Sequence, residues 1–258
     1  MTTSLSTRQV SLTPAAGKRL IGRAVAALPE MAAALADRTV VVLGGTTNAY
    51  VARAILETRG HGEEIDPRQF FRGIVLPPRQ KLDPEGRNRF AGDLVFEHGR
   101  LIRGKQIFDV AESLKAGDVI VKGANAVNLR TRQAGVLIGS PVCGTMGAIL
   151  PAVIGRRVTM IVPVGLEKRV DEDIGELAAL LADGHTDGPR LLPAAGGRVV
   201  TELDAVSILT GATARLVAAG GVAGAEGSCR LAVSGTDAQL EQTGKILREC
   251  TGEPPFAV

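Results

Sequence analysis

Short apolar segments that run directly into glycine turns constrain this chain most. Three of them, Thr39–Leu43, Asp118–Lys122 and Val158–Val162, have apolar centres, and a glycine closely follows each one. Continuous apolar runs of this length are typical of strands buried on both faces of a sheet. Segments with helical spacing lie between them, and this alternation favours parallel strands. We therefore predict an α/β fold with a mostly parallel, Rossmann-like sheet and helices on both faces.

Two further patterns predict local structure. Apolar residues recur at helical spacing over Pro14–Ala36, with Thr13 as the N-cap and a break expected at Pro29. Residues alternate over Asp93–Arg103 around a central His-Gly pair, which predicts a β-hairpin.

The sequence divides into regions that differ in polarity and in expected secondary structure. Residues 1–182 are predicted to form the main α/β ligand-binding domain, with an irregular and more polar insertion at about 60–106. Residues 183–258 are predicted to form a small α+β C-terminal portion, with two strands flanked by helices. This portion is either a separate subdomain or part of the main domain.

Composition excludes several classes of protein. The 32 glycines follow no G-x-y period, which excludes collagen, and compact aliphatic runs with a net charge of +3 argue against disorder. The three cysteines lack CxxC spacing, and no histidine or carboxylate motif has metal-ligand spacing, so neither a disulfide scaffold nor a metal site is predicted. An apolar signal segment is not evident at the start, which predicts a cytoplasmic protein.

Neither a membrane nor a nucleic acid is predicted as a partner. Residues 133–155 carry no charge, but two prolines and five glycines favour a buried strand, turn and helix. Lys and Arg outnumber Asp and Glu nine to four over residues 68–105, but no docking motif for a nucleic acid accompanies them. Three of these basic residues are instead candidates for contact with an anionic substrate: Arg72, Arg79 and Lys81.

The turn after the first apolar run carries the clearest binding signal. Gly44 and Gly45 end the run, and Thr46, Thr47 and Asn48 open the next helix. Unpaired N–H groups at a helix N-terminus, with hydroxyl donors beside them, suit a phosphate or carboxylate. The turn has neither the ending of a P-loop nor the GxGxxG fingerprint, so nicotinamide binding is a weaker alternative.

Two other turns offer polar side chains. Lys122, Gly123, Asn125 and Asn128 follow the second apolar run, and Lys168 follows the third. Amides and cations can hold a polar substrate, although amides cannot act as general acids or bases. Ligands gather beyond the carboxyl ends of parallel strands, so we expect these turns to line one crevice.

The turn over residues 140–147 contains a cysteine. Cys143 at the start of a predicted helix would have a lowered thiol pKa and could act as a nucleophile. Alternatively, it is a cysteine that only packs, as most free cysteines do. Gly144 and Thr145 beside it are candidates for backbone contacts with a ligand.

These segments together resemble a known superfamily. The helix, strand and Gly44–Thr47 turn are similar to the opening of ribose-5-phosphate isomerases, glucosamine-phosphate deaminases and coenzyme A transferases, and to DeoR-type sugar-sensor domains. Lys122–Asn128 looks like the isomerases' Gly-Ala-Asp-Glu segment, and Gly144–Val170 looks like their glycine-rich helix and the strand after it. The likeness covers residues 14–60 and 118–170 and implies a divergent member.

The departures from this superfamily concern its chemistry. Asn125 and Asn128 stand where the isomerases place acidic groups, and a proton shuttle between sugar carbons needs a carboxylate. Coenzyme A transferases use a glutamate between small residues, which makes Glu226 in Gly224–Ser228 a candidate. Only one helical region precedes Thr39, so we expect a stand-alone sensor rather than a DNA-binding repressor if the chain is of the DeoR type.

The sequence thus predicts a protein that binds a small anionic metabolite, either phosphorylated, carboxylated or linked to coenzyme A. An isomerase- or transferase-like activity is expected, without a cofactor. The candidate catalytic residues are Lys122, Lys168, Cys143 and Glu226. The alternative is a non-catalytic metabolite sensor of the same fold, because the acid–base pair is missing. The aliphatic content and the glycine-rich tail are compatible with a homo-oligomer.

Overall fold

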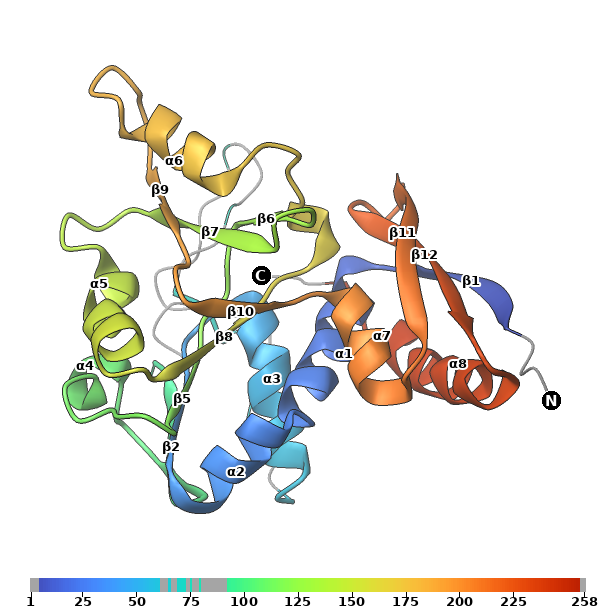
Figure 1. Ribbon diagram of the computed structural model, residues 1–258, viewed down its shortest axis with the longest axis horizontal. Helices are drawn as coiled ribbons and strands as arrows, with labels where there is room; N and C mark the ends of the chain where they lie inside the picture. The colour runs from blue at the N-terminus through green and yellow to red at the C-terminus, as the bar shows by residue number, and fades with distance from the viewer. Residues whose placement is uncertain are drawn as a thin grey trace.

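The computed structural model describes residues 5–60, 65, 69–72, 75, 79 and 92–255. Much of the predicted insertion, including Lys81, lies outside the described residues. Within the described part, the strands form three sheets, of which the largest occupies the middle of the molecule (Figure 1).

The central sheet has six strands, which are β2 (Thr39–Val42), β3 (Leu94–Glu97), β4 (Arg100–Ile102), β5 (Val119–Val121), β8 (Thr159–Pro163) and β10 (Gly197–Val200). Their order is β10-β8-β5-β2-β3-β4. The first four strands in this order run parallel, whereas β3 and β4 are antiparallel to their neighbours. The expected hairpin around His98 and Gly99 is confirmed, and it pairs directly with β2.

The prediction of a mostly parallel, Rossmann-like sheet is therefore wrong. The central sheet is mixed, and the other two sheets are antiparallel. One of them consists of β6 (Ala126–Asn128), β7 (Gln133–Ile138) and β9 (Arg190–Pro193). Only residues 129–132 connect β6 to β7, and a parallel crossover needs a dozen or more residues. Helix α6 (Ile174–Ala182) packs on this sheet.

The third sheet joins the two ends of the chain. It has the order β1-β12-β11, where β1 is Ser6–Leu12, β11 is Thr213–Gly220 and β12 is Ser228–Gly235. Helix α8 (Asp237–Thr251) packs against it (Figure 1). No strand was expected at β1, because a mostly exposed edge strand shows no apolar alternation.

Helices cover both faces of the central sheet. One face packs against α1 (Pro14–Ala26), α2 (Pro29–Asp37), α3 (Thr46–Glu57) and α7 (Glu202–Thr210). The other face packs against α4 (Ile107–Val110), α5 (Gly144–Leu150) and the π-helical turn Pro151–Gly155 that continues α5. Successive residues of each central strand alternate between the two cores.

The predicted break in the first helical region is confirmed. The Thr13 hydroxyl accepts a hydrogen bond from the Ala16 N–H at 3.3 Å and caps α1. Pro29 lies in the first turn of α2, and the backbone at Leu28 is extended. The restriction that a proline places on the preceding residue accounts for the split.

The uncharged residues 133–155 do not form one long helix. They divide into β7, a turn, α5 and the π-helical turn. Over the described ranges, no helix is both long enough and apolar enough to cross a membrane.

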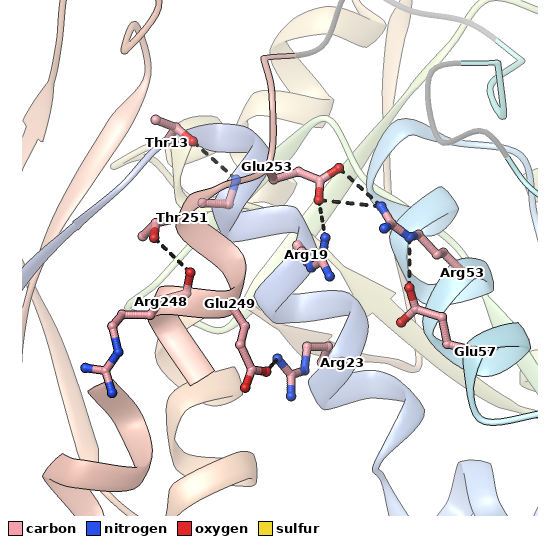
Figure 2. A network of polar contacts seen from close by, with 10 residues as sticks. Thr13, Arg19, Arg23, Arg53, Glu57, Arg248, Glu249, Thr251 and Glu253 are labelled. Carbon is pink, nitrogen blue, oxygen red and sulfur yellow. Dashed lines mark hydrogen bonds and ion pairs between the residues drawn. The ribbon is translucent and has the colours of Figure 1, made fainter. Parts of the chain in front are cut away.

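Ion pairs connect Glu253, just after α8, with Arg19 on α1 and Arg53 on α3. We call these residues and Glu57 the Glu253 network (Figure 2). Glu253, whose side chain is 8 % exposed, accepts from Arg19 Nη1 at 2.5 Å and from Arg53 Nη1 at 3.3 Å. Arg53 also donates to Glu57 at 2.9 Å. Burial, reinforced by the Glu253 carboxylate, raises the pKa of Tyr50 beside it.

Candidate functional site

Polar residues meet where β2, β5 and β8 end. These neighbours are parallel, so their carboxyl ends lie at one edge of the central sheet. The backbone pairing continues past the strands, because Leu43 N–H donates to Val121 O and Lys122 N–H donates to Ile161 O. Since β3 runs in the opposite direction, Asp93 just before it also reaches this edge. We call this the carboxyl edge.

Two buried side chains at the start of α3 have unused hydrogen-bonding atoms. Asn48 Nδ2 donates to Leu43 O at 2.7 Å and to Val121 O at 3.2 Å, which fixes the orientation of the amide. Within the described part of the chain, Asn48 Oδ1 and the Thr47 hydroxyl lack partners. A Cβ on Gly123 would lie 3.4 Å from Asn48 Oδ1, so this buried oxygen lies directly beneath the β5 turn. Orphaned buried polar atoms of this kind call for a partner.

The glycines of the same turn are already engaged. Gly44 N–H donates to Asp93 Oδ1 at 2.9 Å, and Gly45 N–H donates to Phe70 O at 3.0 Å. Thr46 follows as the half-buried first residue of α3. An anion at this turn would therefore rely on Thr47 and on neighbouring cations rather than on the two glycine N–H groups.

Two lysines converge on adjacent peptide groups of the β5 turn. Lys122 Nζ donates to Gly123 O at 3.0 Å, and Lys168 Nζ donates to Ala124 O at 3.0 Å. Lys168 comes from the 3₁₀ turn Leu166–Lys168 after β8. Burial, followed by the charge of Lys168, lowers the pKa of Lys122 to about 8. Lys122 is therefore poised to lose or gain a proton near neutral pH.

Asp93 anchors the turn that precedes α3. Its fully buried carboxylate accepts from Gly44 N–H, from Ile107 N–H at 2.9 Å and from Arg72 Nη2 at 2.7 Å. Arg72, one of the predicted cations, also lies over the Phe108 ring at 5.6 Å. Of the other two predicted cations, Arg79 is exposed and Lys81 lies outside the described residues.

A buried acidic pair lies behind Lys168. Glu202 is fully buried, and its Oε2 accepts from Leu166 N–H at 2.9 Å. Burial first, and then the charge of Glu167, raises the pKa of Glu202 to about 8. Lys18 from α1 is coupled to both carboxyl groups, and burial lowers its pKa. In the described chain, Glu167 Oε1 is buried without a hydrogen-bond partner.

Glycines make room for this pair. A Cβ on Gly17 would lie 2.4 Å from Glu202 Oε1, and a Cβ on Gly165 would lie 1.9 Å from Glu167 Oε2. A side chain at either position would force the neighbouring glutamate to move. The acidic pair is linked to the carboxyl edge through charge, because Lys168 acts electrostatically on the Glu202 carboxyl group.

The two predicted asparagines support backbone instead. Asn125 Oδ1 accepts from Leu137 N–H at 3.0 Å, which links β6 to β7. Asn128 is buried, and its Oδ1 accepts from the N–H groups of residues 130 and 131. Its Nδ2 donates to the carbonyls of residues 171 and 172.

Two predicted nucleophiles lie in exposed turns. Cys143 is exposed in the left-handed region at φ 58°, before Gly144 and the half-buried Thr145. Glu226 is exposed between β11 and β12, where it accepts from Gly224 N–H at 2.9 Å. Among described residues, no hydrogen bond or ion pair links Cys143 or Glu226 to the lysines of the carboxyl edge.

Sequence reasoning missed Asp93, Glu202, Glu167 and Lys18. The one local signal was the position of Asp93 beside the predicted hairpin. No group of three or more His, Cys, Asp or Glu in the described ranges could hold a metal ion. Comparisons with protein-family models, curated proteins and solved structures found no match to this chain.

Proposed function

We propose that the carboxyl edge binds a small phosphorylated or carboxylated metabolite and acts on it in an isomerase- or transferase-like reaction. The observation that carries this proposal is the pair of half-buried lysines at the carboxyl edge, together with the buried Thr47 hydroxyl at the start of α3, which has no partner among the described residues. An ammonium group has three donors. Each lysine uses one of them on a described carbonyl, which leaves donors for an anion.

The ligand would also carry a hydroxyl group. Asn48 Oδ1 can only accept a hydrogen bond, and both of its amide hydrogens already go to backbone carbonyls. A hydroxyl next to the anionic group would satisfy this oxygen, while Lys122 and Lys168 bind the charge. A hydroxylated sugar phosphate or hydroxy acid fits both requirements.

Thermal unfolding with increasing inorganic phosphate or glucose 6-phosphate tests this proposal. A ligand that binds only the folded state raises the melting temperature. Thr47→Val removes the buried hydroxyl at nearly constant shape and is expected to weaken phosphate binding about fivefold, since one hydrogen bond contributes about 1 kcal/mol. Thr46→Val tests the neighbouring hydroxyl in the same way.

Thr58→Val is the matched control, because Thr58 lies at the opposite end of α3 and donates only to Ile55 O. Unchanged phosphate affinity in Thr47→Val, or an equal loss in Thr58→Val, would overturn the assignment of the anion to this edge.

A non-catalytic sensor is the alternative function. Two described carboxylates near the edge are occupied or enclosed, since Asp93 is saturated by donors and Glu202 is fully buried. Neither is available as a base for substrate. Any metabolite that raises the melting temperature would then be tested for turnover, and binding without turnover would favour the sensor.

A further inference from the structure

We propose that Lys122 is an amine nucleophile that forms an imine with the carbonyl group of a small phosphorylated ketone or aldehyde. This inference rests on the proposed function, because the same edge must hold the phosphate. It adds a covalent step and a substrate class.

The contacts of Lys122 suit this role. Its Nζ lies at the carboxyl edge and donates to Gly123 O at 3.0 Å, one peptide away from the Lys168 contact at Ala124 O. Asp93, the acidic group that acts on it electrostatically, is bound to Arg72. In the described chain, Lys122 therefore has no ion pair that would hold its proton in place.

Electrostatics increase the fraction of neutral amine. The groups that act on Lys122 are Lys168 and Arg72, which lower its pKa, and Asp93, which raises it. Burial is the largest influence, and together with the two cations it lowers the pKa of Lys122 to about 8. At pH 7 about 10 % of such an amine is neutral, which is roughly two hundred times the neutral fraction of an ordinary lysine. Desolvation and a neighbouring cation are a known way to activate a lysine.

The chemical step balances without an oxidant. The Nζ lone pair forms a bond to the carbonyl carbon, and the carbonyl π electrons move to oxygen, which takes up the proton that the newly cationic nitrogen loses. The resulting carbinolamine takes a second proton on oxygen from solvent and loses water, while the nitrogen lone pair closes the C=N bond of a protonated imine. Lys168, held one peptide away, supplies positive charge for the phosphate.

Reductive trapping tests the proposal. The intact chain is incubated with dihydroxyacetone phosphate and sodium cyanoborohydride, which delivers hydride to an imine, and labelled lysines are located by peptide mass spectrometry. Lys122 is expected to be labelled at least tenfold faster at pH 7 than Lys245, which is exposed on α8. The labelling rate of Lys122 should rise with an apparent pKa near 8.

Three variants separate the possibilities. Lys122→Met should abolish the fast label, and Lys245→Met should leave it unchanged. Lys168→Met should shift the pH dependence of Lys122 labelling to higher pH, because the charge of Lys168 lowers the pKa of Lys122. If a variant does not fold, the pH dependence of Lys122 labelling in the unmutated chain still tests the proposal.

Uniform labelling of all lysines, or fast labelling of Lys168 alone, would overturn the imine. If phosphate still raises the melting temperature in that case, the proposed function stands without the covalent step. If phosphate has no effect either, both proposals fail.

Discussion

Charged side chains gather both at the carboxyl edge and in the Glu253 network. The arginines of the network are paired with carboxylates, whereas, among the described residues, the two lysines of the edge are not. In the Glu253 network, arginines from α1 and α3 are paired with carboxylates, and Figure 2 shows each contact. At the carboxyl edge, Lys122 and Lys168 face carbonyl oxygens, and Thr47 and Asn48 keep unused polar atoms.

The difference separates a structural contact from a binding site. Paired charges that lie close together lower the free energy of the folded chain modestly and require no ligand. Unpaired charges in a partly buried place raise the free energy of the folded chain. They are typical of sites where another molecule supplies the missing partner. The two regions should therefore respond differently to substitution.

The largest effect is expected where the carboxyl edge does contain a pair. Asp93→Asn leaves Arg72 facing a neutral amide and places an NH₂ group among three donors. Breaking a buried pair should lower the free energy of unfolding by about 3 kcal/mol, which urea denaturation measures. Asp109→Asn is the control, because Asp109 is an exposed cap of the nearby α4. Equal losses in the two variants would mean that burial of Asp93 is unimportant.

A pH dependence of opposite sign should distinguish two glutamates. The pKa of Glu202 is raised to about 8, so its folded state holds a proton that the unfolded state releases. Stability should then fall as pH rises from about 4.5 to about 8. Glu202→Gln should remove this slope. In urea titrations at pH 5, 7 and 9, equal slopes for the variant and the parent chain would contradict the prediction.

Glu249 provides the matched case. Its pKa is lowered by the hydrogen bond from Arg23, so its contribution is present above pH 4.5 and is lost as pH falls below that value. Glu249→Gln should therefore lower stability slightly above pH 4.5 and leave it unchanged well below that value, so the pH slope that it removes is opposite in sign to the slope that Glu202→Gln removes.

The smallest expected changes in the free energy of unfolding differ in sign between the carboxyl edge and the Glu253 network. Glu253→Gln leaves Arg19 without a carboxylate and Arg53 with Glu57 alone, and it should lower the free energy of unfolding by about 1.5 kcal/mol. Lys122→Met removes a poorly solvated charge and should raise it by about 1 kcal/mol. Urea denaturation of both variants in the same buffer checks the pair. Destabilisation by Lys122→Met would mean that its charge is well accommodated.

Local patterns allowed part of this molecule to be predicted. The strand before Gly44, the helix break at Pro29 and the hairpin around His98 depend on neighbouring residues, and all three are present. The lysines of the carboxyl edge could be proposed because each follows a buried strand within a few residues. A residue that directly follows a strand lies near the end of that strand, so its place could be inferred from neighbouring residues alone.

The rest depends on contacts that a local pattern does not contain. The antiparallel direction of β3 beside β2 brings Asp93 to the site, and neither segment alone determines that pairing. Glu202 lies in α7, and its side chain is buried against Gly17 on α1, which is far away in the sequence. The polar strand β1 is stabilised by its partner β12 rather than by its own sequence.

The pairing of β1 with β12 has a consequence for biosynthesis. Thr7 and Ser234 are hydrogen-bonded partners although 227 positions separate them. A ribosome adds about 5 to 20 residues per second, so β1 waits about 10 to 45 s for its partner. Until then its backbone groups must be satisfied by water or by another molecule. The third sheet therefore closes late in synthesis, after most of the central sheet has emerged, and a chaperone that protects the waiting strand would act in that interval.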